Sequence, residues 1–110
     1  MGYYRNIDSS KKKVYSSYDA LPLFTQKVYS ALRLMCTDVF YWDEDLEFTP
    51  TNRQITEISG VTSGITHHLA VLDRNGYIRV TWTYQEGRRK HRIELLDKEE
   101  NRTNNSTMEV

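Results

Sequence analysis

The feature that most constrains the fold is a change in the spacing of apolar residues at the Asn-Gly pair of positions 75–76. Before this pair, Ile65, Leu69 and Leu72 recur at three- and four-residue intervals, which is the spacing of one face of an α-helix. After it, every second residue over positions 78–84 is apolar or aromatic, which is typical of a half-buried β-strand. The chain is therefore predicted to place helices before strands, in a mainly helical α+β fold.

Two further helices are expected upstream. Pro22 suits a first helical turn, and the apolar stripe that follows it consists of Phe24, Val28, Ala31, Leu32 and Met35. Thr51 and Gln54 match a capping box, in which each side chain satisfies a backbone amide at the start of a helix. Gly60 suits the residue that ends this second, short helix.

The third helix and a β-hairpin complete the pattern. Thr62 can cap a helix over residues 62–74. A turn at residues 85–88 then joins the first strand to a partner strand that carries Ile93 and Leu95. The result is a hairpin with a basic tip.

The chain divides into three segments. Its 110 residues suffice for one compact core, which we assign to residues 21–96. Residues 1–20 are rich in Tyr, Ser and Lys without periodicity, and we expect an arm that is flexible or ordered only by a partner. Residues 97–110 are polar and charged, and they are predicted to form a disordered tail.

Three helices, a tight glycine-containing turn and a hairpin resemble the winged helix-turn-helix family of DNA-binding proteins. The segments that carry the resemblance are NRQITEISGV at 52–61, TSGITHHL at 62–69 and LDRNGYI at 72–78. They are most similar to MarR-like regulators and to the amino-terminal domains of phage and plasmid replication proteins. The step from Val61 to Ile65 is one residue shorter than is common in that family. The resemblance implies three core helices, a C-terminal β-hairpin wing and binding to double-stranded DNA.

Helix 62–74 is the predicted reading element for base pairs. The side of this helix opposite its apolar stripe is expected to carry small, hydroxyl-bearing or donor side chains, which suit close approach to the floor of the major groove. The candidate base-reading residues are Thr62, Ser63, Thr66, His67, Ala70 and Arg74. A solvated helix face without a ligand is the alternative interpretation.

Phosphate contacts are expected from the wing at residues 85–92 and from the start of the second helix, where backbone amides are free. The candidates are Thr51, Asn52, Arg53, Arg88, Arg89, Lys90 and Arg92. The basic run can hold phosphates or enter a minor groove. Strand alternation places Arg89 and His91 on the side of Ile93, so part of the run is expected to support the wing instead.

Other kinds of site find little support. The net charge is zero, but basic and acidic residues are segregated. The carboxylates of residues 43–47 are interpreted as an exposed connecting loop rather than as a cation site. His67 and His68 are adjacent and point about 100° apart on a helix, so they cannot chelate one metal together; His68 is expected to pack or hydrogen-bond. No metal or cofactor is expected. The chain shows no nucleophile-and-base pattern and no glycine-rich phosphate loop, so it is not expected to be an enzyme.

The leading hypothesis is a transcriptional regulator, a repressor, that binds specific double-stranded DNA as a homodimer. A dimer is expected because members of this family commonly form dimers and because the chain has more aromatic residues than a three-helix core needs. These residues are Tyr3, Tyr4, Tyr15, Tyr18, Phe40, Tyr41 and Trp42. A replication or plasmid-maintenance factor and a winged-helix protein-interaction module remain as alternatives. No apolar run approaches the length of a membrane span and the start of the chain does not resemble a signal peptide, so a cytoplasmic location is expected.

Overall fold

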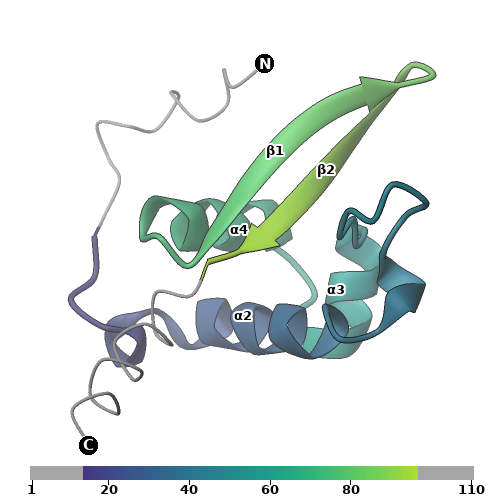
Figure 1. Cartoon of the computed structure of the whole chain (residues 1–110). Helices are drawn as coiled ribbons and strands as arrows, with labels where there is room; N and C mark the ends of the chain where they lie inside the picture. The colour runs from purple at the N-terminus through teal and green to yellow at the C-terminus, as the bar shows by residue number, and fades with distance from the viewer. Residues whose placement is uncertain (1–13, 97–110) are drawn as a thin grey trace, which may run out of the picture.

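The computed structural model describes residues 14–96. The predicted tail and most of the predicted arm lie outside these residues. In the described part, three helices precede an antiparallel hairpin (Figure 1): α2 (Leu23–Met35), α3 (Asn52–Ser59), α4 (Ile65–Arg74), β1 (Ile78–Gln85) and β2 (Arg88–Leu95). Short 3₁₀ turns lie at Tyr18–Ala20 and Val39–Tyr41. The mainly helical α+β fold predicted from the apolar spacing is confirmed at this level.

Local signals predicted α3 correctly. The Thr51 hydroxyl oxygen accepts a hydrogen bond from the Gln54 amide at 3.0 Å, and the Gln54 side-chain oxygen accepts one from the Thr51 amide at 2.9 Å. These two bonds satisfy amides that have no partner inside the helix. Gly60 ends the helix in the left-handed conformation, with φ 79°.

The predicted start of α4 is wrong. The helix begins at Ile65, and Thr62 and Ser63 lie in the turn between α3 and α4. The reason is Gly64, whose φ of 77° places it in the left-handed region, which cannot belong to a right-handed helix. The Gly64 carbonyl accepts the first helical hydrogen bond, from the His68 amide at 2.9 Å, so Thr62 is too far upstream to cap the helix.

The hairpin has the predicted turn. Its register runs from Ile78 opposite Leu95 to Gln85 opposite Arg88, which leaves a two-residue loop. Both loop residues have positive φ, 55° at Glu86 and 78° at Gly87. Such turns match the right-handed twist of the paired strands, so the strands stay paired to the basic tip.

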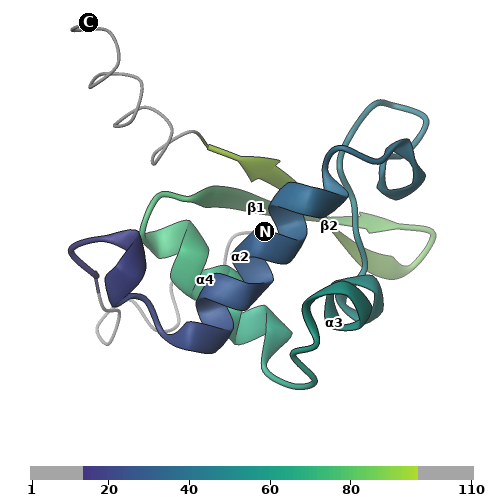
Figure 2. The same ribbon diagram turned by 90° about the horizontal axis from the view of Figure 1, so that it is seen from below.

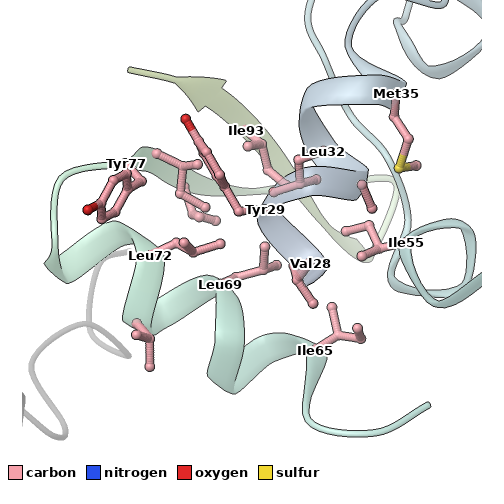
Figure 3. Packing of buried hydrophobic residues seen from close by; sticks show 14 of the residues in the cluster. Val28, Tyr29, Leu32, Met35, Ile55, Ile65, Leu69, Leu72, Tyr77 and Ile93 are labelled. Atoms are coloured by element: carbon pink, nitrogen blue, oxygen red, sulfur yellow. The ribbon is translucent and has the colours of Figure 1, made fainter. Parts of the chain in front are cut away.

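The core lies between α2, α4 and the base of the hairpin. Figure 2 shows α2 crossing α4, and Figure 3 shows Leu32, Leu69 and Leu72 pointing into the space between these elements. One predicted core residue is misplaced: Phe24 is 55% exposed, and Thr25 takes the inward position and is fully buried. The Thr25 hydroxyl hydrogen-bonds His68 Nδ1 at 2.8 Å, which joins α2 to α4 through a satisfied polar pair.

The described part of the predicted arm, residues 14–20, packs against the domain itself. The Tyr15 amide donates to the Asn75 side-chain oxygen at 2.7 Å. The Tyr18 ring lies 5.6 Å from the Tyr29 ring and 5.9 Å from the Tyr77 ring, measured between centroids. The packed domain therefore begins before the predicted boundary at residue 21, because two of the tyrosines counted as spare cover its core.

The connection between α2 and α3 lies beside β2 (Figure 1). Phe48 is buried and forms an isolated bridge with Trp42. The Phe48 carbonyl accepts a hydrogen bond from the Ile93 amide at 2.9 Å. This bond attaches the connection to the free edge of β2 and positions the hairpin relative to α3.

Candidate nucleic-acid interface

A hollow of about 540 Å³ lies between the start of α3, the first turn of α4 and the tip half of the hairpin. Six of the predicted contact residues line it: Thr51, Asn52, Thr66, Arg88, Arg89 and Lys90. Trp82 and His91 form part of its wall. Residues that are far apart in the sequence, and that were selected for two kinds of DNA contact, thus share one surface.

A hydrogen bond joins the two helices at this surface. The Asn52 side-chain amide donates to the Thr66 hydroxyl oxygen at 3.3 Å, and both residues are exposed. Because Thr66 accepts in this bond, its hydroxyl hydrogen stays available for a ligand. The start of α3 and the first turn of α4 therefore present their polar groups side by side.

The exposed face of α4 is shorter than predicted. Thr66 and His67 are exposed on the first turn, whereas Ala70 and Arg74 are half-buried. Thr62 and Ser63 are exposed as well, but in the turn that precedes the helix. His68 is buried, as expected for a histidine that packs and hydrogen-bonds.

Arg89 rests on an aromatic platform on the inner face of the hairpin. Its guanidinium carbon lies 4.3 Å from the centroid of the Trp82 ring, and that ring lies 5.0 Å from the His91 ring. His91 is buried, and its Nε2 donates to the Pro50 carbonyl, so the platform is fixed to the segment before α3. Stacking of this kind orders an arginine without using its hydrogen-bond donors, and Arg89 remains exposed.

Three residues that were predicted to contact phosphates lie within ion-pair distance of carboxylates. Arg92 Nη1 lies 2.8 Å from Glu47 Oε2, and Lys90 Nζ lies 3.7 Å from Asp43 Oδ2. Arg53, on the surface of α3, lies 3.9 Å from the Glu57 carboxylate one turn on.

Arg88 differs from these three residues. It is exposed and forms no ion pair within residues 14–96. Together with the stacked Arg89, it leaves the tip of the hairpin positively charged.

The acidic segment of residues 43–47 is therefore not a plain connecting loop. Asp43 and Glu47 are half-buried against the hairpin, whereas Glu44 and Asp45 are exposed. The opposite charges of the acidic run at 43–47 and the basic run at 88–92 could have indicated this contact from the sequence. Their proximity depends on the fold, however, and no local pattern indicates it.

Burial lowers the pKa of two histidines, His68 and His91. For His68, burial has the largest effect, and the neighbouring His67 lowers the pKa further. For His91, burial again dominates; the hydrogen bond to Pro50 raises the pKa and Arg89 lowers it, with a net decrease. Both imidazoles are therefore held in the neutral form more strongly than in the unfolded chain.

We expect the free energy of unfolding to decrease as the pH falls below about 6.5, the ordinary pKa of histidine. Because the folded-state values are lowered, the unfolded chain takes up protons first, so the stabilisation is complete above this pH and is lost as the pH falls through the folded-state pKa values. Urea unfolding between about pH 7.5 and pH 5 measures the effect. His91→Gln, whose amide nitrogen can still donate to Pro50, should flatten the profile. A wild-type profile that is flat down to pH 5 would contradict the prediction.

None of the helices within residues 14–96 is long and apolar enough to cross a membrane. Searches against family models, curated proteins and solved structures find no match to the chain.

Proposed function

We propose that the chain is a winged-helix protein that binds specific double-stranded DNA. The observation that carries the proposal is the hollow, which brings the start of α3, the first turn of α4 and the arginines of the wing to one surface. An α-helix fits into the major groove of B-DNA, and the hairpin beside it meets the adjacent backbone. Bases and phosphates are then contacted by different elements of the same face.

Side-chain chemistry indicates which residues would contact bases and which would contact phosphates. Thr66 and His67 are exposed at the amino-terminal end of α4, where hydroxyl and imidazole groups can hydrogen-bond base edges. Arg88 and Arg89 at the hairpin tip supply positive charge for phosphates, a contact that does not depend on sequence. The amides of Asn52 and Arg53, which the capping box does not engage, offer further donors for a phosphate oxygen.

The biological role that we propose is transcriptional regulation, as a repressor that acts as a homodimer. Two copies would then occupy half-sites about one helical turn apart, roughly 34–36 Å. Val39, Phe40 and Leu46 are 84%, 71% and 80% exposed in the connection between α2 and α3, and we propose that this connection contributes to the dimer contact. A replication or plasmid-maintenance role would use the same DNA contacts at a different site.

Selection from a random pool of DNA duplexes tests the proposal. Bound fragments should converge on one motif, and affinity for it should fall steeply as salt increases. Sedimentation of the complex gives the number of chains per site. Absence of binding to any duplex at low salt would exclude DNA binding and leave a protein-interaction module as the alternative function.

Thr66→Ala and His67→Gln should each alter the selected motif at one or two base pairs. The expected loss is about 1–3 kcal/mol at the affected base pair, because a base-edge hydrogen bond is removed. Affinity for unrelated DNA should stay the same, since no charge has changed. Thr37→Ala is the matched control, because the Thr37 hydroxyl only donates to the Leu34 carbonyl. An unchanged motif in both variants would show that α4 is not the reading element.

A further inference from the structure

Two carboxylates face two cations of the wing. Asp43 lies 3.7 Å from Lys90 and Glu47 lies 2.8 Å from Arg92. Lys90 and Arg92 alternate with His91 along β2, so they share the outer face of the hairpin. The side chains of these pairs are only 22% to 42% exposed, so water screens them less than it screens fully exposed pairs.

The acidic segment is held in place by its own backbone as well as by these ion pairs. Asp43 Oδ1 accepts hydrogen bonds from the Asp45 amide at 2.9 Å and from the Glu47 amide at 3.0 Å. The next residue, Phe48, accepts the hydrogen bond from Ile93 on β2. The carboxylates are thus presented to the wing by a folded segment whose end is attached to the same strand.

This arrangement affects any phosphate that approaches the wing. Lysine and arginine residues contribute to DNA affinity because each phosphate that they neutralise releases condensed counterions. A cation that already faces a fixed carboxylate must exchange that partner for the phosphate, and the carboxylate then repels the phosphate. Lys90 and Arg92 therefore gain less from DNA than Arg88, which has no ion pair in the described part of the chain.

We propose that Asp43 and Glu47 form an electrostatic strap that competes with DNA phosphates for Lys90 and Arg92. The strap lowers the affinity of the wing for DNA of any sequence and leaves Arg88 and Arg89 as the principal phosphate contacts of the hairpin. This inference rests on the proposed function, and it adds an intramolecular competitor to that function.

The test uses Asp43→Asn and Glu47→Gln in the full chain, with Glu44→Gln as the matched control. The asparagine amide oxygen can still accept the two backbone hydrogen bonds, so the first change removes charge and keeps the segment folded. Glu44 lies in the same segment, is exposed and forms no ion pair within residues 14–96. All three changes remove one negative charge. Thermal melts establish that each variant is folded, and Glu47→Gln alone suffices if the change at Asp43 disrupts the segment.

Binding to a duplex of about 20 base pairs with arbitrary sequence is measured from about 0.05 to 0.2 M salt, a range over which phosphate contacts change the affinity strongly. We expect Asp43→Asn and Glu47→Gln each to raise affinity about eightfold at about 0.1 M salt and to steepen the log–log salt dependence by about 0.9, the value for one added phosphate contact. Glu44→Gln should change affinity by less than about twofold, since it releases no cation. If the wild type binds and the two strap variants behave like Glu44→Gln, the strap is disproved and the proposed function stands. If neither the wild type nor any variant binds DNA at low salt, both proposals fail.

Discussion

Replacing Arg88 and Arg89 together with alanine should reduce affinity for double-stranded DNA on the order of fiftyfold at about 0.1 M salt, because two phosphate contacts are lost. The log–log salt dependence should become shallower by about 2 for the same reason. Both residues line the hollow and are exposed at the hairpin tip. Fluorescence anisotropy with a labelled duplex at several salt concentrations measures both quantities.

Two single changes make this prediction specific. Arg79→Ala removes the same charge from the base of the hairpin, where Arg79 pairs with Glu94 at 3.0 Å, and should cost less than about twofold. Lys90→Ala should also cost less than a change at Arg88, since Lys90 already faces Asp43. If the double variant binds as tightly as the wild type, the wing does not contact DNA, and the hollow has another use.

Sequence alone predicted the elements whose causes are local. The capping box of Thr51 and the left-handed Gly60 are short-range features, so the limits of α3 followed from a few neighbouring residues. The hairpin turn could also be predicted from the sequence, because glycine at position 87 adopts a positive φ without steric strain. The start of α4 was predicted wrongly because Thr62 suits a helix cap by residue type, whereas the helix begins after Gly64, whose φ of 77° lies in the left-handed region.

The parts that sequence could not predict depend on distant partners. Thr25 replaces Phe24 in the core because its hydroxyl meets His68, 43 positions along the chain. Arg92 was assigned to phosphates from its basic neighbours, yet its nearest acidic partner is Glu47, 45 positions away. Most of the residues around the hollow are therefore predictable from the sequence, but the contact of the acidic segment 43–47 with the hairpin is not.

The second large effect concerns the stability contributed by α4, the helix that we propose reads the DNA. Leu72 is fully buried on α4, in the layer between α2 and the hairpin (Figure 3). Leu72→Ala should lower the free energy of unfolding by about 3 kcal/mol, because it removes apolar contacts and leaves a cavity that rigid helices cannot close. For a domain of this size the midpoint of thermal unfolding should fall by roughly 15 °C. Urea and thermal unfolding followed by circular dichroism measure both changes.

A matched control separates this stability effect from loss of the proposed DNA-binding surface. Leu34→Ala makes the same chemical change on α2 at a side chain that is 65% exposed, and it should cost less than about 0.5 kcal/mol. Leu72 does not line the hollow, so at about 10 °C, where the variant remains mostly folded, its DNA affinity should stay within about threefold of the wild type. The arginine variants should show the opposite result, with affinity lost and stability kept. Equal losses of stability at Leu34 and Leu72 would mean that the outer face of α2 is covered in solution, which would support a dimer formed through that helix.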